Sequence, residues 1–125
     1  MARPTVIMHT GFDGTAEEMH VQGAAAGAER SYNVLVFDGP GQGGTIRHQG
    51  MLFRPDWENV VGPVIDFALT LPGVDSERLA LWGLSMGGLL APRAARLRAP
   101  AGRAGGRRRK KAPKPTARSG RSASP

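Results

Sequence analysis

The chain is 125 residues long, enough for at most one small domain, and its formal charge of +7 averages two unlike parts. Residues 1–92 hold five basic and all ten acidic side chains, whereas residues 93–125 hold twelve basic side chains and no acidic one. There is no cysteine, which excludes disulfides and cysteine-ligated metals, and no apolar run reaches the roughly 18 residues of a membrane span. The N-terminus lacks the apolar core of a signal peptide, so a soluble cytoplasmic protein is expected.

The first part of the chain predicts a strand, a helix and a second strand. Residues 5–9 (TVIMH) form a short apolar run between Pro4 and a turn-rich loop, which fits a strand buried on both faces. A capping box of Thr15 and Glu18 then opens a helix that extends to about residue 29, although two glycines weaken it. Residues 32–37 (YNVLVF) form the second buried strand.

The following residues repeat this order. A glycine-rich loop, residues 38–44 (DGPGQGG), precedes a stretch without a helical pattern, in which His48 lies in a loop. Asp56 opens a second helical segment, which Pro63 is expected to kink or split. Residues 78–82 (RLALW) form a third strand that leads into a third apolar segment. This alternation predicts an α/β fold with a three-stranded parallel sheet, the first strand central, and helices on both faces.

The end of the chain differs in composition from everything before it. Residues 99–125 show no apolar periodicity and consist largely of Arg, Lys, Ala, Gly, Pro and Ser. Such a segment has little to bury and is predicted to be disordered. The predicted organisation is therefore a folded domain over residues 3–98 and a disordered basic tail over residues 99–125.

Residues 83–87 (GLSMG) match the pattern G-x-S-x-G, which is weak evidence alone in a chain with 18 glycines. Its position strengthens it, because the pattern joins a predicted strand to an apolar helical segment. Ser85 would then occupy a tight strand-to-helix turn with its hydroxyl exposed, and the flanking glycines would let strand and helix approach closely. The structural alternative is a serine that caps the helix. We interpret Ser85 as a candidate catalytic nucleophile.

A second block, residues 9–15 (HTGFDGT), follows the first predicted strand. Acyl transfer needs N–H donors aimed at the developing oxyanion, and the residue after the nucleophile, Met86, would supply one. The loop after the first strand would supply the other. We favour Phe12 as its donor, with Gly11 as the close alternative; taken alone, this loop would be an ordinary glycine turn.

The glycine-rich loop also fits the spacing of a dinucleotide-binding fingerprint, at residues 39, 41 and 44. That fingerprint requires a helix that opens at the glycines, and no helix is predicted there. The sequence contains no G-x-x-x-x-G-K-[ST] phosphate loop. We expect neither a bound cofactor nor a metal.

Taken together, these blocks over about residues 3–95 resemble the α/β-hydrolase family. More narrowly, they resemble esterases of the fermentation–respiration-switch type and 2,6-dihydropseudooxynicotine hydrolase. The resemblance implies a partial α/β-hydrolase fold and a serine hydrolase that cleaves ester, amide or activated C–C bonds of a small molecule without a cofactor. It assigns Ser85 as nucleophile and Met86 and Phe12 (or Gly11) as the oxyanion hole.

The order of the other catalytic groups departs from that family. Its members carry the acid and then the histidine after the serine, whereas no Asp, Glu or His follows Ser85 here. The three histidines, His9, His20 and His48, precede it and are not expected to act as the base. Without a base a serine hydroxyl is a poor nucleophile, so these 125 residues are expected to be inactive alone. We interpret the sequence as a truncated or frameshifted hydrolase fragment.

A different class of function is a binding module whose basic tail contacts nucleic acid or an anionic surface. Basic runs bind polyanions by counterion release. The tail has no aromatic side chain for base stacking, so its binding would be unspecific. The hydrolase interpretation is preferred, with no specific nucleic-acid partner and no membrane partner.

Overall fold

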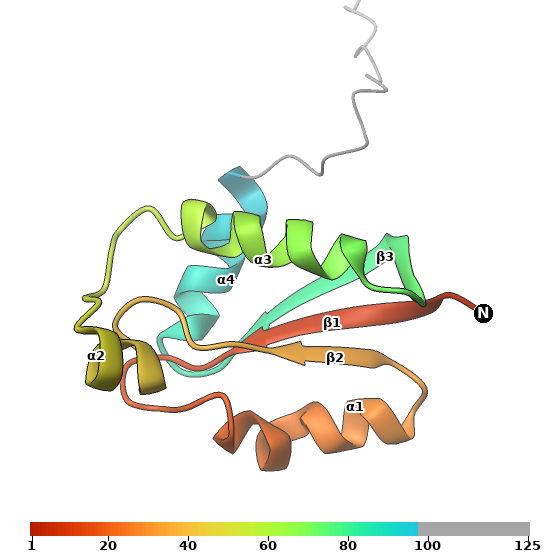
Figure 1. Ribbon diagram of the computed structural model, residues 1–125, viewed down its shortest axis with the longest axis horizontal. Helices are drawn as coiled ribbons and strands as arrows, with labels where there is room; N and C mark the ends of the chain where they lie inside the picture. The colour runs from red at the N-terminus through yellow and green to blue at the C-terminus, as the bar shows by residue number, and fades with distance from the viewer. Residues whose placement is uncertain (98–125) are drawn as a thin grey trace, which may run out of the picture.

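The structure, a computed structural model, describes residues 1–97 (Figure 1). A three-stranded sheet forms its centre, in the order β2-β1-β3, and both pairings are parallel. The predicted α/β architecture and the central first strand are therefore confirmed. The strands are β1 (Arg3–His9), β2 (Asn33–Val36) and β3 (Val74–Gly83).

Helices fill the connections and cover both faces of this sheet. Figure 1 shows α1 on one face and α3 with α4 on the other, as predicted. The helical elements are the π-helix η1 (His20–Ala24), α1 (Ala25–Glu29), α2 (Gly43–Gln49), α3 (Glu58–Thr70) and α4 (Gly87–Leu97).

The first helical segment is shorter and less regular than predicted. The Glu18 N–H donates to Thr15 Oγ1 over 3.3 Å, which is half of the predicted capping box. The backbone leaves helical geometry at Gly23, where φ is 149°, and only residues beyond it form α1. A side chain at residue 23 would also contact Met8 and Trp82, so the break lets this segment pack closely on the sheet.

The prediction that residues 43–49 lack a helix is wrong, and the structure does not show the split that Pro63 could have caused in the next helix. Residues 43–49 form α2, although they carry no apolar pattern, because the Asp38 side chain caps the start of this short helix and a left-handed glycine ends it. Asp38 Oδ2 accepts the Gly44 N–H over 2.9 Å, and Gly50 ends the helix with a φ of 65°. Pro63 neither splits nor ends α3, and its ring is exposed on the helix surface. It is the sixth residue of α3, where its missing N–H removes one helical hydrogen bond, the one to the Asn59 carbonyl.

Each face of the sheet has its own buried apolar cluster. The side of α3 and α4 buries Trp57, Val61, Leu90 and Ala94. The side of η1 and α1 buries Met8, Met19 and Ala24. β1 contributes buried residues to the core, whereas much of β3 is exposed.

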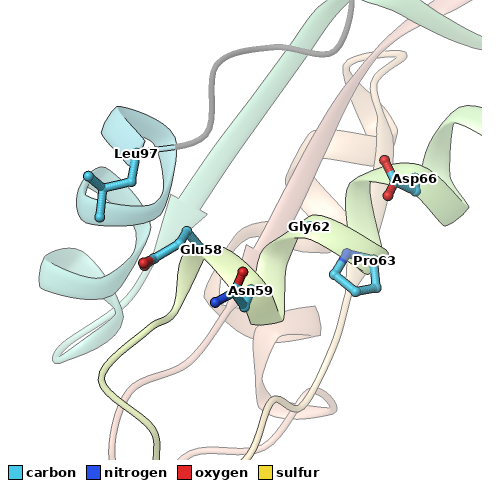
Figure 2. Close-up of a pocket in the computed structure, with 6 residues that line it drawn as sticks. All are labelled: Glu58, Asn59, Gly62, Pro63, Asp66 and Leu97. Carbon is cyan, nitrogen blue, oxygen red and sulfur yellow. The ribbon is translucent and has the colours of Figure 1, made fainter.

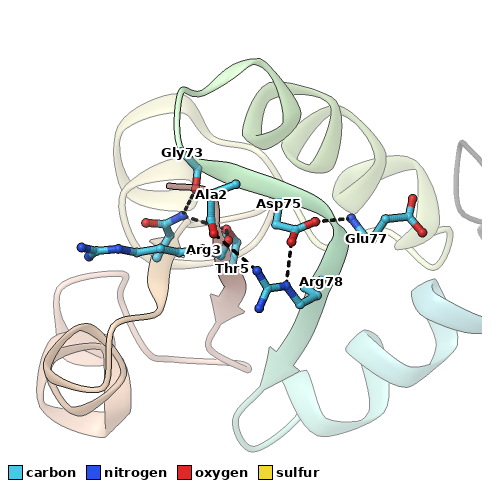
Figure 3. Close-up of polar contacts among 8 residues, drawn as sticks. Ala2, Arg3, Thr5, Gly73, Asp75, Glu77 and Arg78 are labelled. Carbon is cyan, nitrogen blue, oxygen red and sulfur yellow. Dashed lines mark hydrogen bonds and ion pairs between the residues drawn. The ribbon is translucent and has the colours of Figure 1, made fainter.

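Polar contacts close the end of the sheet where the strands begin (Figure 3). Asn33 Nδ2 donates to Thr5 Oγ1 over 3.2 Å and to the Gly73 carbonyl over 2.9 Å. Arg78 Nε donates to Asp75 Oδ2 over 2.6 Å. The opposite end, where the strands finish, carries the candidate site.

The predicted tail over residues 99–125, and residue 98 of the predicted domain, lie outside the described residues. No helix within residues 1–97 is long and apolar enough to cross a membrane.

Candidate active site

Ser85 lies on the turn between β3 and α4, at the carboxyl end of the sheet, with its side chain exposed. Its φ is 58°, in the left-handed region. Among residues 1–97 the only other non-glycine residue with a positive φ is Ser31. This conformation costs a residue with a side chain roughly 1–2 kcal/mol, and the surrounding structure must impose it.

Two glycines allow strand and helix to meet at this turn. A Cβ atom on Gly83 would overlap the backbone carbonyl of Gly87. A Cβ atom on Gly87 would lie 2.5 Å from the carbonyl oxygen of Thr10, in the loop after β1. Any side chain at either position would therefore push the turn away from its neighbours.

The loop after β1 lies directly against this turn. A Cβ atom on Gly11 would lie 2.6 Å from the backbone nitrogen of Met86 and 3.0 Å from Ser85 Cβ. The Leu84 N–H donates to the His9 carbonyl over 3.1 Å and so continues the β1–β3 pairing into the turn. The structure thus brings together Gly11, Ser85 and Met86, three of the four predicted site residues.

Phe12, the fourth, follows Gly11. Its side chain is exposed and stacks on Phe53, with ring centroids 6.1 Å apart and planes 7° from parallel. Within residues 1–97 the backbone N–H groups of Phe12 and Met86 donate to no other atom. Both amides therefore remain able to donate to a bound group.

A buried polar side chain lies beneath the same loop. Gln42 is fully buried, and its Nε2 donates to the carbonyls of Thr10 and Gly11 over 2.7 and 3.0 Å. Its Oε1 accepts the Gly39 N–H over 2.9 Å. Sequence reasoning missed Gln42; the available signal was a single amide side chain inside a loop of glycines.

His9 is buried beside this loop and has both ring nitrogens engaged. Nδ1 lies 2.8 Å from the Thr10 carbonyl, which can only accept, so Nδ1 carries the proton. Nε2 accepts the indole N–H of Trp57 over 3.3 Å. Burial lowers the pKa of His9, against the opposing effect of its hydrogen bond to Thr10. The neutral ring therefore has a structural role and no free nitrogen for the Ser85 proton.

The other two histidines are exposed, His20 in η1 and His48 on α2 rather than in the predicted loop. Within the part of the chain that the structure describes, neither hydrogen-bonds to Ser85. The same residues contain no group of three or more His, Cys, Asp or Glu side chains that could hold a metal ion.

A helix does begin at these glycines, so the absence of a helix no longer excludes a bound dinucleotide. The Asp38 carboxylate accepts the Gly44 N–H at the start of α2 and the Ala16 N–H over 2.8 Å. A pyrophosphate there would compete with that carboxylate and be repelled by it. The start of α2 is therefore unsuited to a phosphate.

A surface pocket lies apart from these loops, on α3 near the end of α4 (Figure 2). Its lining contains none of the predicted site residues. The residues that line it are Glu58, Asn59, Gly62, Pro63, Asp66 and Leu97.

Comparisons with known proteins indicate the family of this chain. Residues 6–121 match the alpha/beta hydrolase family. The hydrolase LUC6 of a Fusarium species is 44% identical over 96 residues, and the 20-hydroxy-prefusarin hydrolase FUS2 of Gibberella moniliformis is 47% identical over 96 residues. Each match covers 74% of this chain and 23% of the relative. A crystal structure of 2,6-dihydroxy-pseudo-oxynicotine hydrolase is similar with a TM-score of 0.72 and 28% identity, covering 78% of this chain and 27% of that one.

The chain therefore belongs to the α/β-hydrolase family, which confirms the predicted resemblance. It spans about a quarter of the length of these curated relatives.

Proposed function

We propose that residues 1–97 carry the nucleophile and the oxyanion-binding groups of a serine hydrolase for small-molecule substrates. Ser85 Oγ attacks the carbonyl carbon of an ester or an amide, or a carbonyl carbon next to an activated C–C bond. The N–H groups of Met86 and Phe12 stabilise the oxyanion that forms, with the Gly11 N–H as the alternative to Phe12.

One observation carries this proposal: the left-handed turn at Ser85 packs so closely on the loop after β1 that Gly11 has no room for a side chain beside the Met86 nitrogen. This proximity supports assigning donors from two separate loops to one oxyanion hole next to the exposed Ser85. Stabilising the developing charge requires such preorganised donors.

The proton of Ser85 needs an acceptor that residues 1–97 do not offer. His9 uses both ring nitrogens, and no Asp, Glu or His follows Ser85 in the sequence. We therefore propose that a polypeptide of these 125 residues hydrolyses a generic ester no faster than its S85A variant. Nucleophile and oxyanion hole must then be tested without the base.

A cysteine at position 85 makes this possible, because a thiol is partly ionised near neutral pH and needs no base. The chain has no native cysteine, so S85C carries a single thiol. Its acylation by p-nitrophenyl acetate passes through an oxyanion, whereas its alkylation by iodoacetamide does not. The ratio of the two rate constants measures oxyanion stabilisation independently of the thiolate fraction.

S31C is the matched control, because Ser31 is also exposed and also has a positive φ, of 65°. We expect the acylation-to-alkylation ratio of S85C to exceed that of S31C by about 10²-fold, the effect of one oxyanion donor. Adding G11A to S85C, which directs a methyl group at the Met86 nitrogen, should remove most of this difference. Equal ratios in S85C and S31C would refute the proposed oxyanion hole.

The alternative is a binding module that contacts nucleic acid or an anionic surface through its basic tail. That tail, residues 99–125, lies outside the described residues, so the structure does not test this alternative.

A further inference from the structure

The Gln42 side chain makes three hydrogen bonds, all to backbone groups of loops at the carboxyl end of the sheet. Its NH₂ group donates to the carbonyls of Thr10 and Gly11, and its Oε1 accepts the Gly39 N–H. The side chain is fully buried, so each bond replaces one that water would otherwise make. One side chain thus ties the loop after β2 to the loop after β1.

These bonds also set the direction of the neighbouring N–H groups. In a planar trans peptide the carbonyl oxygen and the N–H of the next residue point in opposite directions. The Thr10 carbonyl shares its peptide with the Gly11 nitrogen, and the Gly11 carbonyl shares its peptide with the Phe12 nitrogen. With both carbonyls turned toward Gln42, the N–H groups of Gly11 and Phe12 are turned away from it.

We infer that Gln42 is the positioning residue of the oxyanion hole: by holding the Thr10 and Gly11 carbonyls it directs the loop N–H groups toward a carbonyl oxygen of a substrate at Ser85. The inference rests on the proposed function. Only an amide side chain supplies two donors for the carbonyls together with an acceptor for Gly39. His9 assists through its own bond to the Thr10 carbonyl.

Q42E in the S85C chain tests this role. Glutamate keeps the size and the acceptor for Gly39, but its second oxygen faces the two carbonyl oxygens in place of the donor. We expect the acylation-to-alkylation ratio to fall about 10- to 100-fold, the effect of a misplaced catalytic group, while alkylation alone stays unchanged. A purely structural role would lower stability without moving this ratio in the folded protein.

N33D is the matched control for the same chemical change. Asn33 also donates through its amide to two oxygens, those of Thr5 and Gly73, but at the opposite end of the sheet. N33D in the S85C chain should lower the denaturation midpoint and leave the ratio unchanged. Q42N, which keeps both kinds of group on a shorter side chain, should lower the ratio less than Q42E does, and it decides the question if Q42E does not fold.

The outcomes separate this inference from the proposed function. If S85C shows no higher ratio than S31C, the oxyanion hole itself is refuted. If S85C shows the higher ratio and a folded Q42E or Q42N keeps it, only the role of Gln42 is overturned.

Discussion

Ser31 and Ser85 share a left-handed backbone, with φ of 65° and 58°, but for different reasons. Ser31 follows α1, where its N–H donates to the Ala28 carbonyl and the Tyr32 N–H donates to the Gly27 carbonyl, over 3.0 and 3.1 Å. These two bonds define a Schellman motif, in which a left-handed residue ends a helix. The positive φ at Ser31 is therefore explained by local structure.

Ser85 precedes a helix, so no helix end accounts for its conformation. Its turn is held by contacts with a distant segment: the Leu84 N–H bonds to His9, and Gly87 lies against Thr10. A strained serine is thus not a site by itself. It becomes a candidate nucleophile where a second loop approaches it closely enough to exclude side chains.

The largest expected difference between the two regions lies in their glycines. G83A directs its methyl group into the Gly87 backbone, which cannot move aside, and should lower the free energy of unfolding by about 3 kcal/mol or more. G27A, near Ser31, meets only the Val34 side chain, and its higher helix propensity offsets that contact. Urea denaturation of both variants measures the difference. Similar losses would mean that the turn at Ser85 is no more tightly packed than the helix end at Ser31.

Acidification should destabilise the turn at Ser85, which contacts His9, and not the helix end at Ser31. Burial lowers the pKa of His9 below 6.5, so as the pH falls below that value the unfolded state takes up a proton that the folded state resists. The free energy of unfolding should then decrease by at most about 1.4 kcal/mol per pH unit. H9N should remove this contribution, and H20N should retain it.

Hydrogen exchange of backbone amides shows where in the structure this pH-dependent loss of stability occurs. Protonation of His9 would set an N–H against the Trp57 indole N–H, so the Leu84 amide, which bonds to the His9 carbonyl, should exchange faster at lower pH after correction for intrinsic rates. The exchange rate of the Tyr32 amide, corrected in the same way, should not increase at lower pH. An equal response of both amides would contradict a local role of His9.

Glycine at either serine should relieve the backbone strain. S31G and S85G should each raise the free energy of unfolding by about 0.5–1 kcal/mol, because the relief outweighs the added entropy of the unfolded chain. Only S85G removes the proposed nucleophile. Thermal denaturation of both variants measures the change in stability. A loss of stability in S85G would show that the serine side chain supports the turn.

The smallest effect is expected at the surface of the loop after β1. Asp13 lies 3.6 Å from Arg47 on α2, and both side chains are largely exposed. D13N should change the free energy of unfolding by less than about 0.5 kcal/mol. In the S85C chain it should also leave the acylation-to-alkylation ratio unchanged. A large fall in that ratio would mean that this ion pair, rather than Gln42, orients the loop.

The strand and helix order was predictable from the sequence because it depends on local patterns. The apolar runs before His9 and Trp82 lie in strands, and their order along the chain already required parallel pairing. The observed β3 begins earlier than predicted, at Val74, since pairing with β1 rather than apolar pattern decides where it starts. Helix α2 was not predicted because it depends on a hydrogen bond to Asp38, six residues before Gly44, and not on a periodic pattern of apolar residues.

The sequence by itself determined the family, the parallel sheet and the identity of the candidate nucleophile, since the G-x-S-x-G turn and the strands around it are contiguous in the chain. The use of the other groups was decided by tertiary structure. Gln42 and His9 look like ordinary loop and strand-end residues until folding brings Gln42 to the Thr10 carbonyl and the Trp57 indole to His9. Contacts between residues 32 or more positions apart leave no local pattern, because they depend on how the loops meet at the end of the sheet.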